Sequence, residues 1–175
     1  MSLSDLEVHL NRVDSIVTKI NNFVPENKIG TTEFRADLAG LFVVAMVASY
    51  ESCVKEVLWQ YASTKHSDFA TFTNNNFDKL NSKIAINDLH KYAKLFNNAI
   101  NENFKKILNE RKEQILKDSK KDIKCEYQQI LKWRHDFAHA GKHNTTINEA
   151  ITFHNHGKEV LFCFARAFNV LSDKA

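Results

Sequence analysis

Glycine and proline are scarce in this chain, which has four glycines and one proline in 175 residues. Both residues interrupt helices and strands, so a chain with few of them has few turns and long elements. The sequence has no strand-like alternation, internal repeat or low-complexity tail. We therefore expect one all-α domain over residues 1–175, a bundle of four to six helices with a long central helix.

Cysteines are also few, and none has the spacing of a metal or redox motif. Cys53, Cys125 and Cys163 are an odd number without a CxxC pair, and two of them lie in apolar runs. Reduced thiols are therefore expected, which fits a cytoplasmic protein. The N-terminus lacks the basic and then apolar segments of a signal peptide. The longest apolar run, residues 38–48, covers eleven residues, whereas a membrane span needs about 20, so we expect a buried core helix and no membrane contact.

Neither positive nor negative charge is in large excess. The formal net charge is +3 and the sequence pI is about 8.7, which permits an anionic partner but falls short of a dedicated duplex-DNA binder. Basic residues concentrate between residues 105 and 132, where they mix with acidic ones. This mixture favours a solvated face, although part of it can guide RNA through salt-dependent phosphate contacts.

Apolar residues recur at helical spacing along most of the chain. Helices are expected at residues 4–22, 31–63, 86–118 in two pieces, 121–139 and 147–171. The second of these is apolar on two faces, as is typical of a central helix. Residues 64–85 are polar with scattered phenylalanines, and are expected to form a loop with room for one short helix. Thr146 and Glu149 have the spacing of a capping box that opens the last helix.

One short segment concentrates groups that can do chemistry. Arg134, His135, Asp136 and His139 lie within six residues, at the end of a predicted helix that Gly141 can stop. His135 and His139 are one turn apart, and Asp136 and His139 are near neighbours at i, i+3. Arg134 and His139 are about 140° apart around a straight helix. They can converge on one substrate if the last turn unwinds, or if a second copy of the helix faces the first.

A cation beside an imidazole suits phosphoryl transfer in RNA. A histidine with an ordinary pKa near 6.5 can take or give a proton at neutral pH. A guanidinium matches phosphate geometry with paired donors and can stabilise charge that develops on phosphorus. No metal is needed, because the 2′-hydroxyl nucleophile belongs to the substrate. The alternative is structural, since Arg and His near a helix C-terminus also complement the helix dipole.

The segment resembles the R-x4-H motif of the HEPN superfamily, written here as Arg134-HDFA-His139. The context is similar too, because a long buried helix (LAGLFVVAMVASYESCVKEVL) precedes the motif and a capped terminal helix (TTINEAITFHNHGKEVLFCFARAF) follows it. The likeness is strongest to stand-alone domains of the RiboL-PSP-HEPN kind. It covers most of the chain by helix order and is specific around residues 133–141.

The resemblance implies a metal-independent endoribonuclease that requires no cofactor, of the kind found in toxin–antitoxin, antiviral or RNA-processing systems. It implies a homodimer with both motifs in one cleft, and an antitoxin or effector protein as a further partner. Arg134 would bind phosphate, His139 would act as acid and base, and His135 would occupy the polar position after the arginine. Ala140 stands where many members have glycine, and the tyrosine that some members carry two residues after the histidine is absent. Because some members are inactive, the alternative is a catalytically silent module that binds RNA, a nucleotide or a protein.

Several other side chains have two interpretations. Glu51 lies on an apolar stripe, where a carboxylate is unfavourable unless paired; it either holds Arg134 or reaches solvent at the edge of the stripe. Asp136 either orients His139 or is solvated. His154 fits a core histidine better than a ligand, and Trp133 fits packing better than base stacking.

A metal site is a weaker hypothesis. His135, His139 and His143 recur every four residues, but Gly141 is expected to break the helix before His143. No cysteine or glutamate completes an evident tetrahedral set, so we expect no metal.

Overall fold

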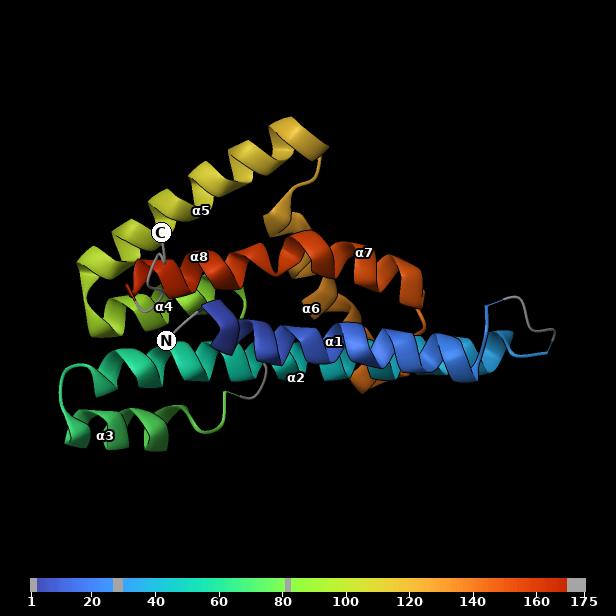
Figure 1. Ribbon diagram of the computed structural model, residues 1–175, viewed down its shortest axis with the longest axis horizontal. Helices are drawn as coiled ribbons and strands as arrows, with labels where there is room; N and C mark the ends of the chain where they lie inside the picture. The colour runs from blue at the N-terminus through green and yellow to red at the C-terminus, as the bar shows by residue number, and fades with distance from the viewer. Residues whose placement is uncertain (1–2, 27–29, 81–82, 170–175) are drawn as a thin grey trace.

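The computed structural model describes residues 3–26, 30–80 and 83–169, with side chains from Leu6 onward. These residues contain helices and no strand, so the all-α class is confirmed (Figure 1). The described part of the chain forms eight helices: α1 (Leu3–Phe23), α2 (Thr32–Ser63), α3 (Ser67–Phe77), α4 (Ile86–Phe96), α5 (Asn98–Ser119), α6 (Ile123–Ala140), α7 (Ile147–Gly157) and α8 (Glu159–Ala167).

The long central helix is α2, which spans 32 residues. It is apolar on several sides because it packs against α1, α3, α6, α7 and α8. By length and composition alone α2 could cross a membrane, but more than half of its most apolar stretch is buried inside the protein. A core helix with so many neighbours has this composition without any membrane.

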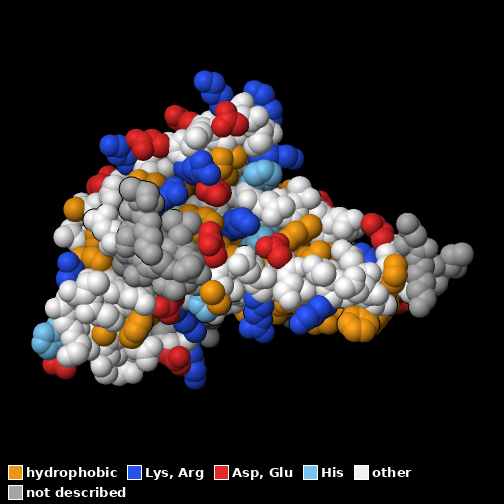
Figure 2. Space-filling model, viewed as in Figure 1, with side chains coloured by type: hydrophobic (Ala, Val, Ile, Leu, Met, Phe, Trp, Pro, Cys, Tyr) orange, Lys and Arg blue, Asp and Glu red, His pale blue; other side chains and the backbone are white. Residues whose placement is uncertain are grey.

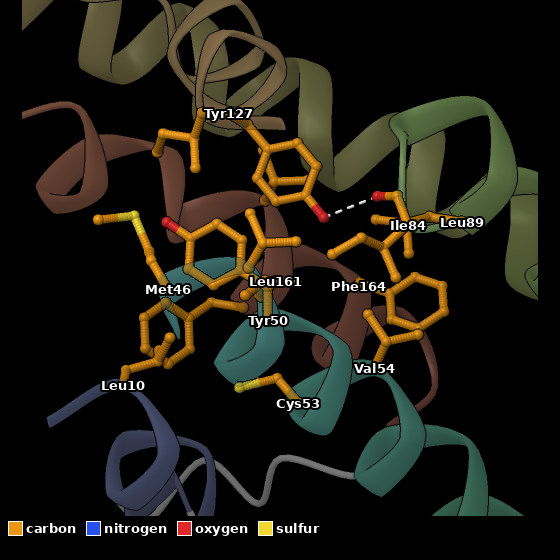
Figure 3. Packing of buried hydrophobic residues seen from close by; sticks show 14 of the residues in the cluster. Leu10, Met46, Tyr50, Cys53, Val54, Ile84, Leu89, Tyr127, Leu161 and Phe164 are labelled. Carbon is orange, nitrogen blue, oxygen red and sulfur yellow. Dashed lines mark hydrogen bonds between the residues drawn. The ribbon is translucent and has the colours of Figure 1, made fainter. Parts of the chain in front are cut away.

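The core is one apolar cluster to which α1, α2 and α4 to α8 all contribute. Figure 3 shows its centre, where Tyr50 of α2 and Tyr127 of α6 lie among Met46, Leu161 and Phe164. The two tyrosine rings are almost parallel, with centroids 5.5 Å apart. Tyr127 donates a hydrogen bond of 2.7 Å to the carbonyl oxygen of Ile84, drawn in Figure 3. A buried hydroxyl needs such a partner, so this bond fixes α6 against the segment before α4.

The number of helices exceeds the expected four to six, for two reasons. The polar region 64–85 contains α3, an amphipathic helix whose N-cap residue, His66, accepts a hydrogen bond from the backbone N–H of Asp68. The expected terminal helix is divided at Lys158 into α7 and α8. Beside this break, Gly157 lies so close to the backbone of Tyr127 that a β-carbon would be 3.2 Å from it. The predicted break near Asn97, between α4 and α5, is confirmed.

Candidate active site

The helix that carries the motif, α6, is capped firmly at its start. The side chain of Asp122 accepts hydrogen bonds from the backbone N–H groups of Lys124 (2.9 Å) and Cys125 (3.3 Å). It also forms an ion pair of 2.9 Å with Lys112 of α5. Burial alone raises the pKa of Asp122, but the hydrogen bonds from Lys112, Cys125 and Lys124 outweigh it and lower the pKa below its usual value. An ionised N-cap stabilises a helix through its free N–H groups and its dipole.

One face of α6 is buried against the rest of the bundle. Tyr127, Ile130 and Trp133 belong to the core, and the ring of Trp133 packs on Phe153 of α7 at 4.9 Å between centroids. Only 5% of Trp133 is exposed, which agrees with the packing interpretation of this residue and leaves no free face for a base.

The motif end of α6 is held to α2 by a close contact. A β-carbon on Gly40 of α2 would overlap the ring of Phe137, so the ring lies directly on the glycine backbone. Phe137 also meets the ring of His143 edge-on, with centroids 5.6 Å apart. The glycine thus lets α2 approach the turn of α6 between Arg134 and His139.

The helix continues through the whole motif and stops where the sequence predicted. Gly141 has a φ of +59°, and its N–H donates to the carbonyl oxygen of Phe137 at 2.9 Å. A left-handed residue after the last turn is the usual way for a helix to end, and glycine adopts it without strain. The last turn of α6 is therefore helical. This excludes the unwinding that was one of the two ways for Arg134 and His139 to converge on one substrate.

Arg134 and His139 consequently leave α6 in different directions. An intact helix separates them by about 140°; Arg134 is half-buried beside the inner face, whereas His139 is exposed. Neither side chain forms a hydrogen bond or an ion pair within the described ranges 6–26, 30–80 and 83–169. Both are therefore available to bind something outside the chain.

The two histidines of the motif lie together. The rings of His135 and His139 are 4.5 Å apart between centroids and are tilted by 48°. Both residues are exposed. The two histidines are thus neighbours one helical turn apart, as predicted, and their imidazoles lie side by side at the solvent-facing end of α6.

Asp136 has a hydrogen-bond partner other than His139. It accepts a hydrogen bond of 3.1 Å from the side chain of Asn144, in the loop that follows the helix. No hydrogen bond joins it to His139 in the described part of the chain. Neither earlier interpretation of Asp136 describes this role, which is to anchor the loop between α6 and α7.

The hypothesis that Glu51 holds Arg134 in an ion pair is wrong. No ion pair joins these two side chains among the residues that the structure describes. Glu51 instead lies near Tyr92 of α4, where burial raises the pKa of the tyrosine and the charges of Asp88 and Glu51 raise it further. Periodicity placed Glu51 on the correct helix but could not give the rotation of α2 relative to α6.

A histidine–carboxylate pair beside the motif was missed in the sequence. His143 Nε2 lies 3.3 Å from Asp37 Oδ1 of α2, so the loop after Gly141 is tied to α2 as well as to Asp136. The described residues contain no group of three His, Cys, Asp or Glu side chains placed to hold a metal ion. His143 had been considered only for such a group. No local pattern could have found its partner, because Asp37 lies far away in the sequence.

The histidines of α7 have structural partners. His154 is fully buried, and its Nδ1 lies 2.9 Å from the hydroxyl oxygen of Tyr50. His156 Nδ1 lies 3.0 Å from Glu126 Oε2 of α6. Burial raises the pKa of Glu126, and the neighbouring His156 opposes that rise. The core interpretation of His154 agrees with these contacts.

Comparison with known proteins identifies the family of this chain. A family model described as RiboL-PSP-HEPN matches residues 8–170, from α1 to beyond the end of α8. The chain belongs to the RiboL-PSP-HEPN family. Searches of curated proteins and of solved structures gave no significant match. The HEPN resemblance of the sequence is thus confirmed across nearly the whole chain, and HEPN membership associates it with RNA-related and nuclease functions.

Proposed function

We propose that this RiboL-PSP-HEPN protein is a metal-independent endoribonuclease whose acting residues are Arg134 and His139. The observation that carries the proposal is that both side chains are unpaired within the described residues and lie on one continuous, well-anchored helix end. A half-buried guanidinium without a partner is unfavourable unless it receives an anion. A phosphodiester supplies that anion and matches the donors of arginine.

The reaction follows from the chemistry of the two side chains. A neutral imidazole of His139 removes the proton of a ribose 2′-hydroxyl, and the 2′-oxygen attacks the adjacent phosphorus. The bond from phosphorus to the 5′-oxygen breaks, and an imidazolium returns a proton to that oxygen. The products are a 2′,3′-cyclic phosphate and a 5′-hydroxyl. Arg134 stabilises the negative charge that develops on the phosphoryl oxygens, and His135 donates to the same group or shares its proton.

The active form that we propose is a homodimer. Within one intact α6 helix, Arg134 and His139 are directed about 140° apart, so one chain does not bring both to the same phosphate. A second α6 helix that faces the first can supply the missing group. The proposal places the enzyme in the cytoplasm, as a toxin, antiphage or RNA-processing component under the control of an antitoxin or effector protein.

The test is cleavage of a mixed RNA pool in EDTA by the native chain and by Arg134→Ala and His139→Ala. We expect the native protein to leave cyclic-phosphate ends, and each variant to lose at least about a hundredfold in rate. Arg12→Ala and His9→Ala remove the same residue types from α1 and are expected to cleave like the native chain.

Three results would contradict the proposal. Equal cleavage by native and motif variants would place the activity elsewhere. No cleavage by folded native dimers, combined with RNA binding that depends on Arg134, would favour the catalytically silent binding module. Loss of activity on adding EDTA would contradict metal independence.

A further inference from the structure

Five exposed side chains of α6 form a stripe along the helix. Cys125, Gln128, Lys132, His135 and His139 are all exposed and follow one another at intervals of three or four residues. Residues at this spacing lie above one another on one side of a helix. We call these five residues the outer stripe; it lies opposite the core-facing side of α6 and ends at His139.

The outer stripe carries positive charge and no carboxylate. Lys132 lies at its middle and forms no ion pair or hydrogen bond with the described residues. Glu126, on the inner side of α6, is buried and is engaged by His156. Asp136, at the edge of the stripe, is half-buried and accepts a hydrogen bond from Asn144.

The neighbouring helix α5 has a mixed pattern. Acidic residues are interspersed among its basic ones, and Lys106, Arg111 and Lys112 form ion pairs, whereas Lys105 and Lys117 form none with the described residues. Figure 2 shows Lys or Arg side chains and Asp or Glu side chains interspersed over the projecting end of the molecule, at the top of the view where α5 lies. Alternating charges of this kind form a solvated face. Unpaired lysines occur on α5 as well, so the outer stripe differs from α5 in having no carboxylate among its side chains.

We propose that the outer stripe is a binding track for single-stranded RNA, with Lys132 on a phosphate and Gln128 on a neighbouring phosphate, sugar or base. The proposal rests on the proposed function, because it extends the site from His139 toward the start of α6. From Cys125 to His139 the track rises about 21 Å. A strand stacked as in a helix advances about 3.4 Å per nucleotide, so the track holds about six nucleotides.

The chemistry of the outer stripe favours a single strand over the other occupants. One convex row of amide, ammonium and imidazole groups matches one phosphodiester backbone, whereas the deep major groove of duplex RNA excludes side chains. A second α6 along the full length of the stripe is a poorer occupant, because the stripe has no large apolar side chain and would place Lys132 opposite Lys132. Charge complementarity therefore points to the polyanion.

The first test measures binding without cleavage. The probe is a fluorescent single-stranded RNA of about twelve nucleotides, 2′-O-methylated throughout so that no 2′-hydroxyl can attack. We expect Lys132→Glu to raise its Kd at least about fivefold, and the salt dependence of log K to fall by about 0.7. Lys105→Glu, which changes the same charge on an exposed position of α5, is expected to bind like the native chain.

A second test attaches a crosslinker to the native cysteine of the outer stripe. Cys125 is exposed at the far end of the outer stripe, whereas Cys53 and Cys163 are buried, so a thiol-directed photocrosslinker modifies Cys125 in the native chain. We expect it to capture the single-stranded probe, and an excess of the same RNA without label to compete. A Cys125→Ser, Lys105→Cys chain carries the crosslinker on α5 and is expected to capture little.

The outcomes separate this inference from the proposed function. Native affinity in Lys132→Glu, together with normal cleavage by the native chain, would overturn the track and leave the nuclease standing. Loss of binding in Lys132→Glu without any cleavage by the native chain would retain the track and contradict the nuclease. Tighter binding of duplex than of single-stranded RNA, or conversion of a dimer to a monomer by Lys132→Glu, would also overturn the track.

Discussion

His154 is a histidine that the fold keeps uncharged. Its side chain is 0% exposed, and its Nε2 has no hydrogen-bond partner among the described residues. Burial lowers the pKa of His154 to about 3, with a further contribution from the charge of Lys158. The imidazole is thus available to Tyr50 as a neutral partner and plays no part in proton transfer at the motif.

The low pKa of His154 predicts a loss of stability in mild acid. In the unfolded chain a histidine titrates near 6.5, so below this pH the unfolded state binds a proton that the folded state excludes. This destabilisation of the folded state is absent at pH 7 and grows as pH falls from 6.5 toward 3. We expect the free energy of unfolding to fall by about 2 kcal/mol between pH 7 and pH 5 from this residue alone. Urea denaturation at both pH values measures it.

The control for this prediction is His154→Gln, which retains a polar partner for Tyr50 but does not titrate. Its stability is expected to fall less between pH 7 and pH 5 than that of the native chain, by about 2 kcal/mol. Equal pH dependence in the two proteins would mean that His154 is protonated in the folded state.

Between elements, the contact that positions the motif is the one between Gly40 and Phe137. A methyl group on Gly40 would occupy the space of the Phe137 ring. Gly40→Ala is therefore expected to destabilise the protein by about 1–3 kcal/mol, because a side chain or a helix must shift. Chemical denaturation measures this loss.

Helix propensity gives the opposite expectation for Gly40→Ala, since alanine stabilises a helix interior by up to about 1 kcal/mol relative to glycine. A more stable variant would therefore contradict the close contact. The double variant Gly40→Ala, Phe137→Leu is expected to recover part of the loss, because the smaller side chain leaves room for the methyl group.

Helix positions were largely predictable from the sequence, but helix rotations were not. The apolar spacing of α2 and α6 and the stop at Gly141 are local signals, and they gave boundaries within two residues. The break at Lys158 has only a weak local signal, the preceding Gly157, because apolar helical spacing continues beyond it from Val160. The missing ion pair of Glu51 with Arg134 and the unexpected pair of His143 with Asp37 depend on how two helices face each other, which no single helix encodes.

At the scale of the whole molecule, the apolar side chains of α8 are not available for a dimer interface. The side chains from Val160 to Ala165 in α8 are all buried within the chain's own core. Exposed apolar side chains lie elsewhere: Phe34 is 54% exposed and Leu41 is 56% exposed. They are seven residues apart on one face of α2, and Leu41 is next to Gly40, where α2 meets the motif end of α6.

We expect this face of α2 to take part in the homodimer. Leu41→Glu should convert a dimer to a monomer at micromolar concentration in light scattering, because it places a charge in an apolar contact. Leu95→Glu, at a 73% exposed leucine of α4, is the matched control and should remain dimeric. A monomeric native chain would contradict both this interface and the shared site.

The candidate site could be selected from the sequence, but the way its two residues would act together could not. Arg134 and His139 stand out because they form a contiguous motif, and the structure adds that both are unpaired among the described residues. In the proposed dimer a second chain brings them together, and no local pattern in one helix encodes how two chains meet. The contacts of an antitoxin or effector protein would likewise depend on a second chain.

The division of α6 into a packed side and an outer stripe has a consequence for how such proteins diverge. The residues of the outer stripe contribute no packing, so mutations there can accumulate over generations while the fold survives. Arg134, on the packed flank, is constrained by the neighbouring core and, in the proposed function, by chemistry as well. A lineage built on this helix can thus change what its outer side binds without having to evolve a new protein core.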